Sequence, residues 1–235
     1  MSKNGRITIS KYEYLKVGQL FDWADKEHYV KWFTGRSGRH RRTETMLPRL
    51  VRKGKLKTKR VGKKIAYIVP RKGRKPHPNI EHGLGSTEGL VRFWRSRMDG
   101  LIIPERHFRG FGIVPEWGIS YNNGKILLYE FCTADNFFRS GNIQGKMTRY
   151  NQYLPSIEAK FGREGIVLFV IDVGEKDVEE YIVKRLPLGD QFFFADYQTF
   201  LRQPIGDQLK APIYIWGGDG EKYPLESKYV ESEDA

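Results

Sequence analysis

The chain has 235 residues, of which 39% are hydrophobic and 14% aromatic, enough apolar material for folded cores. Its formal charge is +13, and residues 1–75 hold 23 Lys and Arg against 5 Asp and Glu, or +18, so residues 76–235 sum to −5. This composition excludes a chain that is disordered throughout. The segregated positive charge predicts a polyanionic partner, with nucleic acid as the leading class, at one end of the molecule.

Membrane and disulfide-stabilised classes do not fit the sequence. It contains no run of eighteen apolar residues, and its N-terminus lacks the charged, apolar and small-residue order of a secretory leader. A single cysteine, Cys132, excludes an internal disulfide framework and a cysteine-based zinc cluster. We therefore expect a cytoplasmic protein with no membrane partner.

A capping motif opens the first predicted helix. Ser10 and Glu13 have the S-x-x-E spacing in which two side chains satisfy the free N–H groups of a helix start, so we predict a helix from there to about Asp22. Apolar residues at helical spacing predict a second short helix over residues 26–33. The two glycines within residues 35–42 predict a loop.

A third helix is predicted between Thr43, as its N-terminal cap, and Gly54, since glycine adopts the left-handed conformation at a helix end without steric cost. Its apolar stripe consists of Met46, Leu47, Leu50 and Val51. Residues 56–61 and 64–69 then form two β-like runs around Gly62 and Lys63, which predicts a basic hairpin.

Three helices followed by a hairpin resemble the winged helix-turn-helix modules of DNA-binding proteins. This resemblance implies that the third helix enters the major groove of double-stranded DNA and that the hairpin lies along the phosphate backbone. Arg42 and Arg49 are the candidates for base edges, because guanidinium can pair with guanine through two hydrogen bonds. The full set of candidate DNA contacts is Arg41, Arg42, Arg49, Arg52 and Lys53 at the helix and Lys55, Lys57, Lys59, Arg60, Lys63 and Lys64 on the hairpin.

Two other interpretations of the basic segment remain open: a disordered basic tail, and a winged helix that contacts only other proteins.

Prolines, a glycine and basic residues between 70 and 78 predict a linker. We therefore divide the chain into a winged helix-turn-helix domain (1–72), a basic linker (73–79) and an α/β domain (80–235).

The second domain is predicted to hold a mixed sheet flanked by helices. A hairpin with the turn Asn122-Asn123-Gly124 joins two of its strands, and a continuous apolar run at 165–172 predicts a strand buried on both faces. Pro155 should kink or split the long helix between them. The predicted elements are a helix at 86–98, strands at 114–121, 125–132, 165–172, 192–195 and 213–216, and a helix from 143 to 161.

Two carboxylates on this hairpin form the candidate catalytic site. Glu116 precedes one strand and Glu130 lies near the end of the next, so both could bind one magnesium or manganese ion. This layout resembles the PD-(D/E)xK nucleases, which place an acid after a proline and an acid–x–lysine motif on the next strand. Here Cys132 occupies the lysine position, and the resemblance implies that Lys146, on the following helix, replaces it.

The order of motifs along the chain is similar to that of the plasmid replication-relaxation family. The motifs are His82-x-Leu84, Pro115-Glu116, Tyr129-Glu130-x-x-Thr133, Lys146-x-x-x-Tyr150, Phe192–Asp196 and Ile215-Trp216, after a winged helix. The resemblance implies a DNA-binding protein of a plasmid or phage that acts in replication, its control or DNA processing.

Two alternatives stay open beside this function. The first is an active metal-dependent DNA endonuclease, with an inactive nuclease relative as its counterpart, in which the two glutamates are structural. The second is a winged-helix transcriptional regulator whose second domain dimerises or senses a ligand. The oligomeric state is open, with a homodimer as one option.

Overall fold

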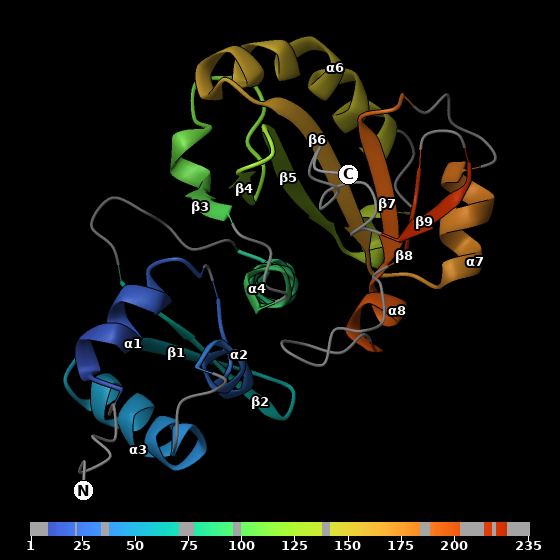
Figure 1. The fold of residues 1–235 in the computed structure, drawn as a ribbon. Helices are drawn as coiled ribbons and strands as arrows, with labels where there is room; N and C mark the ends of the chain where they lie inside the picture. Colours follow the sequence, from blue (N-terminus) through green and yellow to red (C-terminus); the bar gives the residue numbers. More distant parts are fainter. Residues whose placement is uncertain are drawn as a thin grey trace, which may run out of the picture. The chain divides into compact units, whose positions relative to one another are not determined.

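The computed structural model describes residues 9–21, 23–33, 38–70, 78–95, 100–137, 142–183, 189–202, 214–217 and 220–224. The chain forms two compact units, Met1–Arg95 and Ser96–Ala235 (Figure 1). The predicted boundary is earlier, at residues 73–79. Residues 71–77, which hold most of that predicted linker, lie outside the described residues.

The first unit begins with α1 (Lys11–Gly18) and α2 (Lys26–Trp32). The predicted capping motif of α1 is confirmed, because the Ser10 N–H donates to Glu13 Oε2 at 2.7 Å and the Glu13 N–H donates to Ser10 Oγ at 3.3 Å. Aromatic rings form the contacts between these helices: Tyr14 of α1 lies 5.8 Å from Tyr29 of α2, between ring centroids. The start of the first unit is therefore fixed by one polar cap and an aromatic core.

Helix α3 (Arg39–Arg52) starts five residues earlier than predicted. Its N-cap is Gly38, whose left-handed conformation (φ +68°) turns the chain into the helix. The prediction that Thr43 caps this helix is wrong: Thr43 is buried, and its Oγ1 hydrogen-bonds the hydroxyl of Tyr14 at 2.8 Å. Gly54 ends the helix region with φ +65°, as predicted.

The predicted basic hairpin is confirmed as β1 (Lys57–Val61) and β2 (Lys64–Ile68), which pair antiparallel. Beyond this hairpin, Ala24 forms an isolated antiparallel bridge to Tyr67 of β2. A small apolar cluster of Trp23, Ala66 and Ile80 packs beneath the strands. The hairpin is thus attached to the segment before α2 as well as to the chain that follows it.

Helix α4 (Ile80–Arg95) belongs to the first unit, although the sequence analysis assigned its residues to the second domain. The hydroxyl of Thr87 on α4 donates to the backbone oxygen of Trp23 at 2.6 Å. Ile80, in the first turn, joins the apolar cluster under the hairpin. The helix that was expected to open the α/β domain is therefore part of the first unit.

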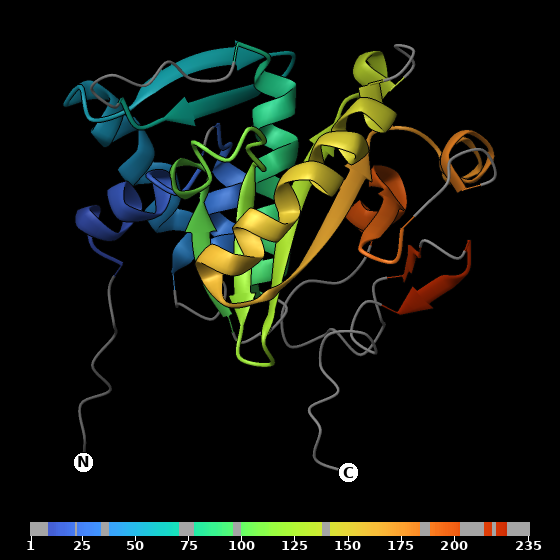
Figure 2. The ribbon, with the colours of Figure 1, turned by 90° about the horizontal axis from the view of Figure 1, so that it is seen from above.

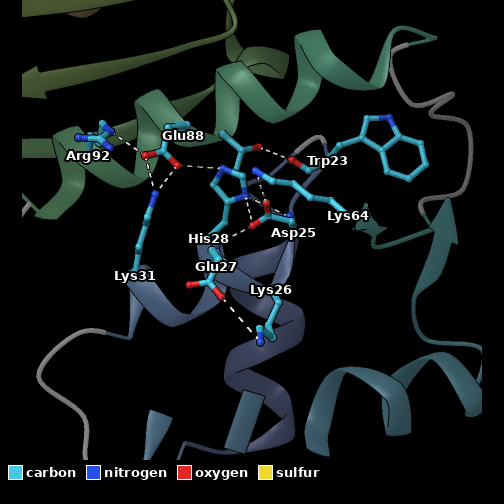
Figure 3. A network of polar contacts seen from close by, with 10 residues as sticks. Trp23, Asp25, Lys26, Glu27, His28, Lys31, Lys64, Glu88 and Arg92 are labelled. Carbon is cyan, nitrogen blue, oxygen red and sulfur yellow. Dashed lines mark hydrogen bonds and ion pairs between the residues drawn. The ribbon is translucent and has the colours of Figure 1, made fainter. Parts of the chain in front are cut away.

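A buried network of charges joins α2 to α4 (Figure 3). The imidazole Nδ1 of His28 lies 2.9 Å from Oδ1 of Asp25, and its Nε2 lies 3.1 Å from Oε2 of Glu88. Glu88 also accepts hydrogen bonds from Lys31 at 2.7 Å and from Nε of Arg92 at 2.6 Å. His28, Asp25, Glu88 and Arg92 are all buried, so each charge depends on its neighbours for compensation.

Burial and pairing act in opposite directions on these groups. Burial alone would lower the pKa of His28, but hydrogen bonds and charges from Asp25 and Glu88 raise it above its ordinary value. The Asp25 N–H also donates to Nδ1 at 3.0 Å, which favours the neutral ring, but two carboxylates in contact outweigh one N–H. Burial would raise the pKa of both carboxyls, yet contacts with His28 hold them well below their usual range.

The stability of the first unit should therefore decline as the pH rises above about 6.5. Since folding raises the pKa of His28, its protonated form stabilises the fold fully below the ordinary value of 6.5, and this contribution is lost as the pH rises through the folded pKa. Asp25 and Glu88 stay ionised throughout that range. Hydrogen exchange of α2 amides measures the difference in the free energy of unfolding between the wild type and His28→Gln. This difference should become smaller as the pH rises. An advantage that stays constant with pH would contradict this.

The second unit is built on one seven-stranded mixed sheet, in the order β3-β4-β5-β6-β7-β8-β9. Strands β3, β4 and β5 are antiparallel, β5, β6 and β7 are parallel, and β8 and β9 return antiparallel. The bounds are β3 (Gly100–Pro104), β4 (Trp117–Tyr121), β5 (Lys125–Cys132), β6 (Glu164–Ile171), β7 (Phe192–Asp196), β8 (Tyr214–Trp216) and β9 (Lys222–Pro224). The predicted mixed sheet flanked by helices is confirmed.

Helix α6 (Asn142–Phe161) crosses one face of this sheet (Figure 2). Its buried side chains, including Met147 and Tyr150, form one core with the facing side chains of β5, β6 and β7. Pro155 was predicted to kink or split this helix, and it does not split it, because the helix continues through the proline. The central strand β6 is buried almost throughout, as its unbroken apolar run predicted.

Smaller elements complete the second unit. They are η1 (Glu105–His107), α5 (Ala134–Phe137), α7 (Glu175–Val178), a π-helical turn η2 (Glu179–Val183) and α8 (Tyr197–Arg202). Strands β3 and β9 were not predicted from the sequence. Across the described ranges, no helix combines the length and the apolar character needed to cross a bilayer.

Candidate nucleic-acid interface and carboxylate site

The eleven basic residues predicted to contact DNA are all exposed. Helix α3 buries Thr43, Met46 and Leu47 against the first unit, so its arginines lie on the remaining surface of the helix. The four consecutive residues from Lys57 to Arg60 in β1 are all exposed, so exposed side chains lie on both faces of the hairpin. The first unit therefore presents basic side chains from a helix and from an adjoining hairpin.

The single acidic residue of α3 does not neutralise this surface. Glu44 is paired with Lys26 of α2, with 3.3 Å between Oε1 and Nζ. Two of the eleven basic residues already have partners: Nε of Arg42 donates to the Ile9 carbonyl at 3.1 Å, and Nζ of Lys64 lies 3.3 Å from Asp25. These two contacts make Arg42 and Lys64 partly structural.

The two candidate carboxylates lie across the β4–β5 hairpin. Trp117 pairs with Tyr129, and the Glu116 N–H donates to the Tyr129 carbonyl at 3.0 Å. Glu116 lies just before β4, and the regular pairing of the two strands ends at Trp117 and Tyr129. Alternate residues of β5, Ile126, Leu128 and Cys132, belong to the core formed with α6, so Glu130 projects to the side that α6 covers.

Lys146 and Tyr150 bring two functional groups from α6 to Glu130. Nζ of Lys146 donates to Oε2 of Glu130, and the Tyr150 hydroxyl donates to Oε1 at 2.7 Å. Their spacing of four residues places both side chains on one face of the helix. The structure thus joins two of the three predicted catalytic residues, Glu130 and Lys146, in direct contact, and it adds Tyr150 as a second partner of Glu130.

Glu116 lies close enough to affect the pKa of both α6 side chains. Burial alone would lower the pKa of Lys146, but Glu130 and then Glu116 raise it above its ordinary value. Burial, followed by Glu130 and Glu116, raises the pKa of Tyr150 well above its ordinary value. The lysine therefore stays a cation and the tyrosine a neutral hydrogen-bond donor at physiological pH.

Cys132 occupies the position where the PD-(D/E)xK pattern has lysine, but it cannot supply a charge there. It is buried in the apolar core of the second unit, and this burial raises its pKa to about 11. A thiol with that pKa is protonated at neutral pH and is a poor nucleophile. The cationic role in this site belongs to Lys146.

The donor set suits a hard cation, but it is small. Glu116 and Glu130 offer carboxylate oxygens, and magnesium sites commonly combine one or two carboxylates with water and phosphate oxygens. Within the part of the chain that the structure describes, no group of three or more His, Cys, Asp or Glu side chains could hold a metal ion. The two glutamates therefore fit a cation that shares its ligands with a phosphate substrate.

Comparison of the chain with protein-family models, with curated proteins and with solved structures finds no match.

Proposed function

We propose that this chain is a double-stranded DNA-binding protein of a plasmid or phage, acting in replication, its control or DNA processing. The observation that carries the proposal is the set of eleven exposed basic residues on α3 and the adjoining hairpin. Three helices followed by a two-stranded hairpin, with a bridge from Ala24 to Tyr67, support the proposal, because winged helix-turn-helix modules offer a recognition helix and a hairpin wing in that order. The plasmid or phage setting rests on the order of motifs in the sequence.

Removing three hairpin lysines should weaken binding to all duplexes alike. Phosphate contacts release counterions, so log affinity of the full chain should fall with log salt at a slope of roughly −5 to −9. Each lost contact should reduce the magnitude of that slope by about 1, and the triple variant Lys57→Ala, Lys59→Ala, Lys63→Ala by up to about 3. Fluorescence anisotropy on a labelled duplex at several salt concentrations measures both slopes.

The matched control removes the same charge from the second unit, through Lys125→Ala, Lys160→Ala and Lys176→Ala. Its slope should equal that of the wild type. Binding that is insensitive to salt, or equal effects of the two triple variants, would contradict DNA binding by this surface.

A second candidate function is metal-dependent cleavage of DNA, for which the grouping of Glu116, Glu130 and Lys146 is the supporting observation. Within the second unit, the antiparallel strands β3, β4 and β5 are followed by α6 and by the parallel strand β6, an order that is compatible with the PD-(D/E)xK core. In such a reaction the two glutamates would hold a magnesium or manganese ion, which supplies Lewis-acid activation of water and of the phosphodiester. Lys146 would donate to the charge that develops on phosphate oxygen, with Tyr150 fixing the orientation of Glu130.

Nicking of supercoiled plasmid in the presence of magnesium or manganese tests this second function. We expect Glu130→Gln to lower the nicking rate by at least about 100-fold, because several kcal/mol of transition-state stabilisation depend on the metal site. Glu164→Gln, at the exposed start of β6, is the matched control and should retain the rate. Equal rates for the two variants would exclude this site as the source of cleavage. Salt-sensitive DNA binding without any cleavage would favour the binding protein or a transcriptional regulator.

A further inference from the structure

The carboxylate of Glu130 has both oxygens engaged by side chains of one helix. Tyr150 donates to Oε1 at 2.7 Å, and Lys146 donates to Oε2. Glu130 is buried, whereas 22% of the Lys146 side chain is exposed. The tyrosine is fully enclosed and its ring packs edge-on against Phe169, with 6.0 Å between centroids. One partner of Glu130 is thus fixed in the core, and the other reaches it from a more accessible position.

We propose that Lys146 and a divalent cation compete for Oε2 of Glu130, with Tyr150 as the positioning residue that holds Oε1. The proposal rests on the metal-dependent second function and deepens it, since it assigns what the site does before metal binds. The ammonium acts as an exchangeable counter-ion. Once released from Glu130, it becomes free to donate to a phosphate oxygen.

Glu116 and Glu130 bring two negative charges to the same end of the β4–β5 hairpin, because Glu116 is hydrogen-bonded to Tyr129, the neighbour of Glu130. Two carboxylates that lie close together repel each other unless a cation lies near them. Lys146 supplies that cation, because its ammonium donates to Oε2 of Glu130. A divalent ion would compensate the same two charges more fully, and two cations that need the same carboxylate oxygen exclude each other by charge and by size.

Tyr150 acts differently from Lys146. Its hydroxyl is neutral, so it adds no repulsion towards an incoming cation and can keep its hydrogen bond to Oε1 throughout. The ring lies between the carboxylate and the aromatic side chains of β6 and β7, where Phe169 stacks on Phe194 at 5.4 Å. Glu130 therefore presents a single oxygen, Oε2, for exchange.

The decisive experiment measures manganese binding to the full chain without DNA, by electron paramagnetic resonance of free Mn²⁺. Lys146→Met removes the competing charge and preserves side-chain length, so we expect Mn²⁺ to bind at least about tenfold more tightly than to the wild type. Lys160→Met, on the same helix and exposed, is the control and should match the wild type. Affinity of Lys146→Met equal to or weaker than that of the wild type would overturn the proposal.

A second measurement uses the unmodified chain and so does not depend on a variant that folds. Acetic anhydride labels lysine amines, and mass spectrometry reports the label on each residue. Competition predicts that Mn²⁺ increases the labelling rate of Lys146 and leaves that of Lys160 unchanged. A labelling rate of Lys146 that does not change at saturating Mn²⁺ would overturn the exchange.

A third variant separates this inference from the function on which it rests. If Glu130→Gln abolishes Mn²⁺ binding while Lys146→Met fails to strengthen it, the metal site stands and the competition is wrong. If Glu130→Gln leaves Mn²⁺ binding unchanged, the metal site and the competition both fall. The salt dependence of DNA binding by the first unit is independent of either result.

Discussion

Replacing Glu88 by alanine should lower the free energy of unfolding of the first unit by about 3–5 kcal/mol, the usual cost of removing one partner from a buried charge network. The carboxylate of Glu88 compensates His28, Lys31 and Arg92 at once. His28 and Arg92 are buried, so without Glu88 they remain charged or polar groups that water cannot solvate. Hydrogen exchange of α2 and α4 amides, followed at increasing denaturant concentration, gives the change in the free energy of unfolding of this unit alone.

Glu81→Ala provides the matched control. Glu81 lies on the same helix and is exposed, so its replacement should change the free energy of unfolding by no more than about 0.5 kcal/mol. Glu88→Gln separates charge from size, because the amide can still accept a hydrogen bond while its charge is lost. If Glu88→Ala and Glu81→Ala had similar effects, the network would not hold α4 to α2.

The second large effect is expected in the sheet, where Phe169→Ala should lower the free energy of unfolding of the second unit by about 3–5 kcal/mol. Phe169 lies at the centre of β6 and is completely buried. Its ring stacks on that of Phe194, with centroids 5.4 Å apart and planes 10° apart, and meets the Tyr150 ring edge-on. Truncation opens a cavity among rings that cannot collapse into it without moving α6 or β7. Denaturant unfolding monitored by hydrogen exchange of β6 amides measures the loss.

Leu101→Ala is the control for this prediction, since Leu101 belongs to the same unit and its side chain is largely exposed. We expect a change within about 0.5 kcal/mol. Phe169→Leu should cost less than Phe169→Ala because it leaves a smaller void. A cost for Phe169→Ala no larger than that for Leu101→Ala would mean that the aromatic cluster contributes little to the fold.

Local signals in the sequence predicted much of the fold and the grouping of the candidate site. The spacing of Ser10 and Glu13 defines a helix start through contacts within one turn, which no distant residue needs to complete. The turn at 122–124 fixes the register of its hairpin. That register places Trp117 opposite Tyr129, so Glu116 and Glu130, the residues beside this pair, lie at the same end of the hairpin.

Other features depend on partners far apart in the sequence. Asp25 and His28 have the spacing of a capping pair, yet nothing local indicates that Glu88 would take the other nitrogen of the imidazole. The buried position of Thr43 depends on the hydroxyl of Tyr14, from another helix. The positive charge of residues 39–42 and the two glycines before them predicted a loop. The helix nevertheless begins at Arg39, because the rest of α3 packs against the first unit and extends into these residues.

The attachment of α4 has a consequence for how the chain folds during synthesis. The first 72 residues include α1, α2, α3 and the hairpin, but the second carboxylate that pairs with His28 and the apolar side chain of Ile80 come later. In a nascent chain that has released only those residues, His28 has Asp25 as its one carboxylate partner and Trp23 lacks the contact with Ile80. The first unit therefore completes its fold only after Arg95 has left the ribosome, and any fragment intended to fold alone must extend to that residue.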